Sequence, residues 1–118
     1  MPKRIGVHRH AATVKQSFRC YYCRAPMWEH DQSAFVAQYR VTLKQAALVR
    51  STAEHLRPLS EGGPNSGVNI VAACLYCNAT RHKARKPLAP AAYRERVQRR
   101  VASGRWITSA FFNPRCNG

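Results

Sequence analysis

The clearest hydrophobic pattern in the chain lies between residues 33 and 50, where apolar side chains recur at every fourth position. They are Phe35, Tyr39, Leu43 and Ala47. Side chains four residues apart share one face of an α-helix. We therefore expect a helical segment here, with Thr42 as its only internal break and with the apolar stripe packed on the core.

Further along, two short segments at residues 51–56 and 69–72 are strand candidates. The turn formers between them are numerous enough to force a long loop: Pro58, Gly62, Gly63, Pro64 and Gly67. From Cys74 the pattern becomes helical to about Lys86, where Pro87 stops it. Strand, long loop, strand and helix make a ββα unit, so we expect a small α+β fold.

The two ends of the chain differ in character. Residues 1–16 are basic and polar, and we expect them to form a loosely ordered arm. Near the other end, Pro90 begins a second, basic helix over about residues 91–101, which Gly104 terminates. The tail from residue 105 is apolar enough to fold back on the domain. At 118 residues the chain is expected to be one domain: the arm, a core over residues 18–86, and a C-terminal helix and tail over residues 87–118.

Four of the five cysteines form two C-x-x-C pairs. Each pair places two thiolates on a tight turn, and two such turns can close a tetrahedral zinc site with no open position. We predict a structural Zn²⁺ with these four ligands: Cys20, Cys23, Cys74 and Cys77. The 50 residues between the pairs far exceed the roughly 15–20 of compact zinc ribbons. An inserted segment must therefore separate a hairpin-like knuckle at residues 18–27 from the second pair.

The alternative for these cysteines is disulfide formation. No hydrophobic signal segment opens the chain, since residues 1–16 are basic and polar, so we expect a reducing, cytoplasmic location that disfavours disulfides. The fifth cysteine, Cys116, has no C-x-x-C partner and is expected to be a free thiol.

Charge restricts the partners. Twenty Lys and Arg against five Asp and Glu give a net charge of +15, which favours a polyanionic partner. Fifteen of the twenty are Arg, whose planar guanidinium binds phosphate in a bidentate way. There is no 18-residue apolar run, and the basic residues are spread along the chain, so we expect nucleic acid and no membrane.

Residues 53–81, AEHLRPLSEGGPNSGVNIVAACLYCNATR, contain an acidic-His pair, a Gly-Gly loop, an Asn before an apolar strand, and C-x-x-C-N followed by a basic residue. In this order they closely resemble the HNH endonuclease family, which has a ββα-metal fold. The spacing from His55 to Asn69 is 14 and to Asn78 is 23, which resembles the HNH domain of RNA-guided CRISPR nucleases. With the first cysteine pair, the resemblance covers about half of the chain; residues 1–17 and 87–118 lie outside it.

Phosphodiester hydrolysis needs a water nucleophile, a base, and positive charge beside the phosphoryl and leaving oxygens. His55 suits the base, because an ordinary histidine pKa near ~6.5 leaves a neutral fraction at cytoplasmic pH; its counterpart in HNH enzymes has this role. The resemblance implies that Glu54 binds a divalent metal. A carboxylate and the Asn78 amide oxygen would suit Mg²⁺ or Mn²⁺. Asn78 could instead cap the helix after the second knuckle.

Two further residues have expected roles. His82 lies one helical turn after Asn78, and colicin-type HNH toxins carry a metal-binding His at a similar offset, so His82 is a candidate third ligand. A contact with phosphate or solvent is the alternative. Asn69 is expected to join the ends of the long loop through backbone hydrogen bonds and so to hold His55 in place.

Residues 81–105 hold nine Lys and Arg and one acid, a net charge of +8. We expect the ligand-bearing helix to enter a DNA groove with four of these side chains against phosphates. They are Arg81, Lys83, Arg85 and Lys86. The sequence thus predicts a metal-dependent HNH endonuclease that cuts double-stranded DNA. The alternative is a non-catalytic zinc-ribbon protein that binds nucleic acid, which would have no need of Glu54, His55 and Asn78 together.

Overall fold

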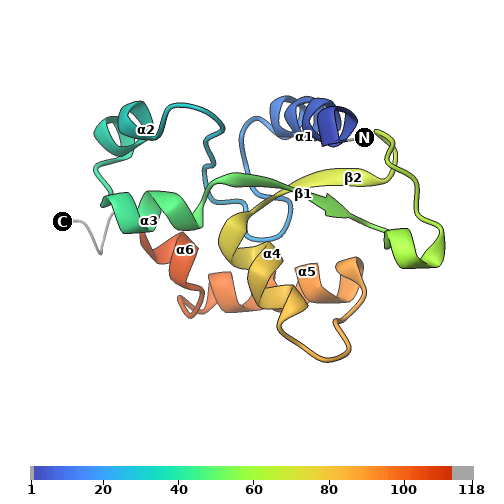
Figure 1. Ribbon diagram of the computed structural model, residues 1–118. Coiled ribbons are helices and arrows are strands. Elements are labelled where there is room, and N and C mark those ends of the chain that lie inside the picture. The colour runs from blue at the N-terminus through green and yellow to red at the C-terminus, as the bar shows by residue number, and fades with distance from the viewer. Residues whose placement is uncertain (1, 113–118) are drawn as a thin grey trace.

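The computed structural model describes residues 2–112, and a two-stranded antiparallel sheet lies between helices at its centre (Figure 1). Strand β1 (Ser51–His55) pairs with β2 (Ile70–Cys74) in a register that places Ser51 opposite Cys74 and His55 opposite Ile70. Helix α1 packs on the sheet from one side, and α4 contacts it from the other. The helices are α1 (Pro2–Lys15), α2 (Gln32–Tyr39), α3 (Leu43–Leu48), α4 (Leu75–His82), α5 (Pro90–Ala102) and α6 (Ile107–Ala110).

Strand β2 runs directly into α4, so the predicted ββα unit is confirmed. Cys74 is both the last residue of β2 and the N-cap of α4, where its Sγ accepts a hydrogen bond from the Cys77 backbone N–H at 3.4 Å. One cysteine therefore joins strand, helix and knuckle. The first knuckle is hairpin-like as expected, with an antiparallel bridge between Arg19 and Pro26.

The insertion between the knuckles breaks into two helices at the predicted place. Arg40 adopts a left-handed conformation (φ 54°) that ends α2. Thr42 then begins α3 with a capping box: its side chain accepts from Gln45 N–H, and the Gln45 side chain accepts from Thr42 N–H.

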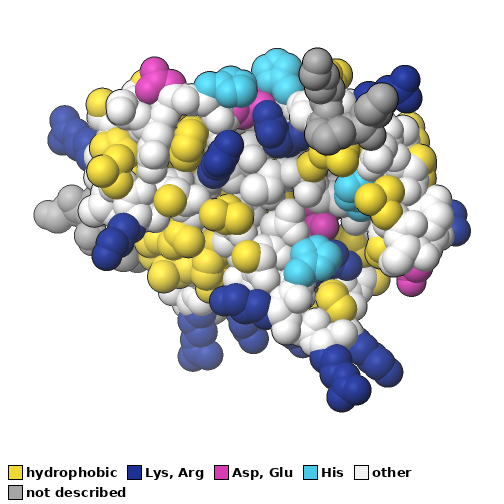
Figure 2. Space-filling view, in the orientation of Figure 1, with side chains coloured by type: hydrophobic (Ala, Val, Ile, Leu, Met, Phe, Trp, Pro, Cys, Tyr) yellow, Lys and Arg dark blue, Asp and Glu magenta, His cyan; other side chains and the backbone are white. Residues whose placement is uncertain are grey.

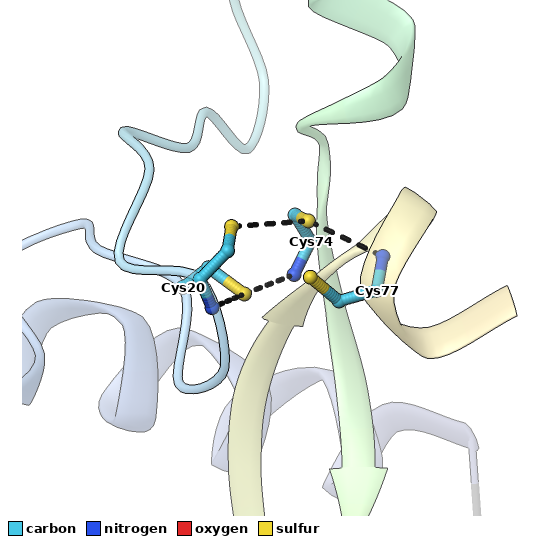
Figure 3. Close-up of side chains that lie close together, drawn as sticks. Cys20, Cys74 and Cys77 are labelled. Atoms are coloured by element: carbon cyan, nitrogen blue, oxygen red, sulfur yellow. Dashed lines mark hydrogen bonds between the residues drawn. The ribbon is translucent and has the colours of Figure 1, made fainter. Parts of the chain in front are cut away.

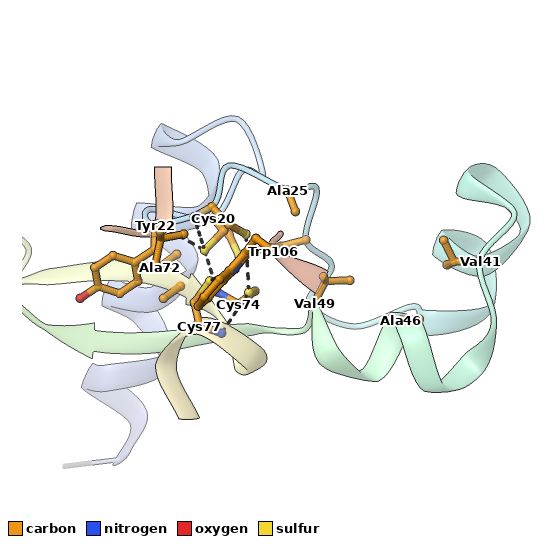
Figure 4. Close-up of a cluster of buried hydrophobic side chains, with 14 of the residues drawn as sticks. Cys20, Tyr22, Ala25, Val41, Ala46, Val49, Ala72, Cys74, Cys77 and Trp106 are labelled. Atoms are coloured by element: carbon orange, nitrogen blue, oxygen red, sulfur yellow. Dashed lines mark hydrogen bonds between the residues drawn. The ribbon is translucent and has the colours of Figure 1, made fainter. Parts of the chain in front are cut away.

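This break makes the predicted apolar stripe wrong beyond Tyr39. Phe35 is buried, but Leu43 is 64% exposed and Ala47 is also exposed. The change of direction at Arg40 resets the helical phase, so α3 buries Ala46 and not Leu43. Figure 4 shows that Ala46, Val49 and Val41 extend the core from the cysteines toward the insertion.

The prediction that residues 1–16 form a loosely ordered arm is wrong. Residues 2–15 form α1, which contacts both strands. Thr13 is fully buried, and its hydroxyl lies 2.8 Å from that of Ser51. Just after the helix, the Gln16 side chain pairs with the open edge of β2: its Nε2 donates to Ala72 O (2.8 Å) and its Oε1 accepts from Ala72 N (3.0 Å). The segment is thus ordered by contacts with distant residues.

The C-terminal region follows the prediction in part. Helix α5 buries Tyr93 and Val97, Gly104 (φ 73°) follows its end, and Trp106 folds back into the core. Helix α4 is shorter than predicted and ends at His82. The chain after it turns back, and Arg81 Nε donates to Leu88 O at 3.0 Å. The predicted free thiol of Cys116 lies outside the described residues.

None of the helices within residues 2–112 combines the length and the apolar character that a membrane span requires.

Candidate functional site

The four cysteines of the two C-x-x-C pairs meet at one buried point, where they are placed to hold a metal ion. Figure 3 shows three of them, Cys20, Cys74 and Cys77. Their sulfurs all lie within 4.8 Å of one another. Ligand sulfurs about 2.3 Å from a tetrahedral zinc would be about 3.8 Å apart. The Cys23 and Cys74 sulfurs are 3.9 Å apart, so both the donor set and its spacing fit a structural zinc.

Backbone N–H groups point at the sulfurs, which is how a protein stabilises thiolate charge. Cys20 Sγ accepts from the N–H groups of Tyr22 (3.3 Å), Cys23 (3.5 Å) and Cys74 (3.2 Å). Burial by itself raises the pKa of Cys20, but hydrogen bonds with the three other thiols bring that pKa well below its ordinary value. The pKa of Cys74 is raised by its hydrogen bonds to Cys20 and Cys23, and burial raises the pKa of Cys77.

The C-terminal segment completes the surroundings of the cysteines, which sequence analysis missed. Trp106 Nε1 donates to Cys77 Sγ at 3.3 Å, and Thr108 Oγ1 donates to Cys23 Sγ at 3.2 Å. Thr108 is fully buried. No spacing rule links a Trp or a Thr to a cysteine 29 or 85 positions earlier in the chain. The sequence indicated only that this tail is apolar.

We expect one tightly held zinc per chain, because four thiolates at this spacing leave no position open. Elemental analysis after a chelator wash checks the stoichiometry. The raised pKa values of Cys74 and Cys77 mean that, without metal, these thiols keep their protons at neutral pH. Zinc must displace those protons, so its affinity should rise with pH and its binding should release acid. A folded chain without metal, or an affinity independent of pH, would contradict this.

A second site lies at the end of β1, where a hollow of about 380 Å³ opens beside α4. Neighbouring strand residues normally face opposite sides of a sheet, yet Glu54 and His55 both line this hollow, which continues around the strand end to residues 58–60 of the loop. Helix α4 adds Asn78 and His82. The structure therefore brings together the base candidate and all three metal-ligand candidates.

Glu54 is 3% exposed and its two carboxylate oxygens have different partners. Oε1 lies 3.1 Å from His82 Nε2. Oε2 accepts from Tyr22 OH at 3.1 Å and from Arg81 Nη1 at 3.3 Å. Burial, reinforced by the Glu54 charge, raises the pKa of Tyr22, so its hydroxyl remains a hydrogen-bond donor. Glu54 is thus fixed by the hydrogen bonds of Oε2 to Tyr22 and Arg81, while Oε1 lies next to His82, a second metal-ligand candidate.

The structure corrects the expectation for Arg81. This residue is 5% exposed and forms a buried ion pair with Glu54, so it lines the hollow from within and is not part of the exposed basic surface that follows α4. The predicted role failed because adjacency to Lys83 says nothing about which side of the helix faces the core. Lys83, Arg85 and Lys86 are exposed after the end of α4. Figure 2 shows Lys and Arg side chains projecting from the lower edge of the molecule, below α4 and α5.

Asn78 links α4 to β1. Its Nδ2 donates to Thr52 Oγ1 (3.0 Å) and to Ala53 O (3.2 Å). The alternative in which Asn78 caps the helix is wrong, because Cys74 is the cap. The carboxamide oxygen of Asn78 accepts no hydrogen bond from residues 2–112, and this leaves it available to a ligand in the hollow.

His55 has a partner that sequence analysis missed. Its Nε2 lies 2.6 Å from Asn65 Oδ1. An amide oxygen can only accept, so Nε2 carries a proton, and in the neutral ring Nδ1 keeps the lone pair. Asn65 lies in the turn-rich loop, where an Asn is ordinary, and the sequence contained no signal for this role.

The long loop is closed as predicted by Asn69. Its Oδ1 accepts from Arg57 N (2.8 Å), and its Nδ2 donates to Arg57 O (3.0 Å) and Pro64 O (2.9 Å). Two of the three glycines of the loop, Gly62 and Gly63, are required by the backbone. Gly62 has φ 83°, and a Cβ on Gly63 would lie 1.8 Å from Arg57 O. The loop can therefore press against the end of β1 beside His55.

Comparison with known proteins agrees with this geometry. Residues 42–84 match the family model described as HNH endonuclease. The matched segment contains both strands, α4, the second cysteine pair and every candidate residue of the hollow, whereas the first cysteine pair lies outside it. Searches of curated proteins and of solved structures returned no match. The motif order, the ββα unit and this match together lead to one conclusion: residues 42–84 are an HNH endonuclease domain.

Proposed function

We propose that this protein is a metal-dependent endonuclease that hydrolyses phosphodiester bonds of double-stranded DNA. The observation that supports this best is the single hollow lined by Glu54, His55, Asn78 and His82. A histidine with a free ring nitrogen there sits beside a carboxylate and an amide, the groups that hydrolysis of a phosphodiester calls for.

His55 acts as the general base. Because Nε2–H donates its hydrogen bond to Asn65 Oδ1, Nδ1 is the atom that removes a proton from the attacking water. The hydrogen bond also restrains the ring, so the lone pair keeps one direction. This restraint matters because proton transfer requires hydrogen-bond contact between the base and the water.

Glu54 Oε1, Asn78 Oδ1 and His82 Nε2 are the atoms that would hold a divalent metal. Two oxygens and one imidazole nitrogen suit Mg²⁺ or Mn²⁺, with Mn²⁺ accepting the nitrogen more readily. When bound, such an ion supplies positive charge beside the phosphoryl and leaving oxygens. The fit rests on the placement of Oε1 next to His82 and on the unused Asn78 oxygen.

DNA is attracted by the exposed cations after α4. Lys83, Arg85 and Lys86 lie immediately beyond the helix that carries Asn78 and His82. Phosphate contacts from this segment would place a backbone over the hollow without reading base sequence.

One observation supports the non-catalytic alternative. The buried Arg81 already neutralises Glu54, so this carboxylate has a stable partner without any metal. A zinc-ribbon protein that binds DNA would keep this pair for structure alone. The two functions differ in whether cleavage accompanies binding.

Supercoiled plasmid, incubated with the zinc-loaded protein and either Mg²⁺, Mn²⁺ or neither, should be cleaved only when a divalent metal is present.

Asn78→Ala and His82→Ala should each weaken calorimetric metal binding and slow cleavage, with partial rescue by excess Mn²⁺, because each removes a ligand atom. Lys44→Ala is a matched surface control, since Lys44 is exposed on α3 and does not line the hollow. DNA binding without cleavage under every metal condition would favour the alternative. Weaker DNA binding by His82→Ala at unchanged metal affinity would make His82 a phosphate contact.

A further inference from the structure

A chain of hollows leads away from the active site along α1. Asn65, the partner of His55, lines one hollow with Arg4 and His8. His8 also lines the next, together with Tyr21 and Arg94. These last two line a third hollow on the first cysteine knuckle. Each hollow shares at least one lining residue with its neighbour, and we call the surface that the three form together the basic groove.

The floor of the basic groove is one face of α1. Arg4, His8, Ala11 and Lys15 line it, and their spacing of three or four residues places them on one side of the helix. Lys15 lies eleven positions after Arg4, a rise of about 17 Å at 1.5 Å per residue. That length corresponds to roughly five base pairs of duplex DNA at 3.4 Å each.

The lining of the basic groove carries positive charge and no negative charge. No Asp or Glu is among the residues that line its three hollows. Its cations come from α1, the knuckle and α5: Arg4, Lys15, Arg19, Arg24 and Arg94. The Arg94 guanidinium lies 4.5 Å from the centre of the Tyr21 ring, so this cation is held in place by an aromatic face.

Arg24 adds an independent observation. It has φ 64°, a left-handed conformation that glycine adopts far more easily, and its N–H closes the knuckle by donating to Cys20 O at 2.9 Å. The backbone at this turn is therefore better suited to glycine, yet the residue present puts an exposed cation at the end of the groove.

We propose that the basic groove binds the sugar-phosphate backbone of the same DNA molecule that is cut beside His55. The bound stretch of DNA would lie to the side of the cut where Asn65 is located. The inference rests on the proposed function, because that function is what identifies DNA as the ligand. It adds a second contact surface, built from α1, the knuckle and α5, to the expected contacts after α4. The groove chemistry recognises phosphate and not base edges, so it would extend the footprint without adding sequence specificity.

The test compares Arg24→Gly with Arg40→Gly. Both positions are exposed arginines at positive φ (64° and 54°), so both changes remove one charge and suit the backbone, but Arg40 lies at the end of α2 and lines none of the three hollows. Binding to a labelled duplex of about 25 base pairs is measured by anisotropy without added Mg²⁺ or Mn²⁺. For Arg24→Gly we expect affinity about tenfold lower at ~50 mM salt, and a log–log salt slope shallower by about 0.9, the value for one lost phosphate contact. Arg40→Gly should retain the wild-type slope.

Lys15→Gln, from the middle of the groove, should behave as Arg24→Gly does, and zinc content with a thermal melt verifies that each variant is folded. If Arg24→Gly and Lys15→Gln both bind like Arg40→Gly, the groove does not contact DNA and the inference is overturned. Because no cleavage is needed, a wild-type chain that binds DNA but never cuts it would refute the proposed function and leave the groove standing.

A cleavage assay tests whether the groove and the active site hold one molecule. On the long duplex, Arg24→Gly should raise KM and leave kcat unchanged. A second duplex ends within about two base pairs of the cut on the groove side, so it is too short to extend the five base pairs along α1. On this short duplex, Arg24→Gly and Arg40→Gly should have the same KM. A KM that is raised equally on both duplexes would overturn the single-molecule arrangement.

Discussion

Cys74→Ser should unfold the domain, and not merely slow it, because this residue is used three times. It ends β2, caps α4 and contributes a sulfur 3.9 Å from that of Cys23. A structural zinc contributes on the order of 10 kcal/mol or more, which is comparable to the entire stability of an ordinary domain, about 5–15 kcal/mol. The measurement is a far-ultraviolet circular dichroism melt together with the zinc content.

The matched control is Cys116→Ser, which makes the same chemical change at the cysteine outside the two C-x-x-C pairs and should keep both the zinc and the melting transition. Asn78 and His82 lie on α4, directly after Cys74, so loss of the zinc should also abolish any cleavage. A cooperative melt of Cys74→Ser near the wild-type temperature would show that the fold does not depend on the metal.

His55→Ala should lower the cleavage rate by about 100- to 10,000-fold, the usual contribution of a general base. Divalent-metal affinity and DNA affinity should stay near wild type. The side chain is half-buried and its hydrogen bond is to Asn65, so its removal leaves Glu54, Asn78 and His82 in place. Plasmid cleavage, calorimetric metal titration and DNA anisotropy measure the three quantities separately.

His30→Ala serves as the histidine control, because His30 is exposed and does not line the hollow beside α4. Asn65→Ala should fall between His30→Ala and His55→Ala, since it frees the ring but keeps the base. Cleavage by His55→Ala at the wild-type rate would remove His55 from the mechanism and leave the non-catalytic DNA-binding alternative.

Sequence alone was sufficient for the features that depend on near neighbours in the chain. The two C-x-x-C turns specified the metal ligands, because the geometry of each turn is local. The break at Thr42 followed from its ability to cap a helix, and the loop after His55 followed from its Gly and Pro content. The order of strand, loop, strand and helix then placed His55 and Asn78 in one unit. In each of these cases a few adjacent residues decide the conformation.

Tertiary structure decided which residues complete each site. Helix α1 carries no regular apolar stripe, and it is held by partners far along the chain, such as Ser51 and Ala72. Its ordered face, in turn, creates the basic groove. The helix that holds Asn78 also turns Arg81 inward, where it meets Glu54 27 residues earlier in the chain.

The same distinction explains the residues that sequence analysis missed. Thr108 and Cys23 are 85 positions apart, and Asn65 contacts His55 from ten positions further along the chain. A hydrogen bond between such partners depends on where the backbone returns, and no periodicity in the chain encodes that. Spacing therefore pointed to the candidate metal ligands and to the candidate base. Their hydrogen-bond partners, the burial of Arg81 and the DNA-facing role proposed for α1 followed only from long-range packing, in which each contact depends on the whole fold.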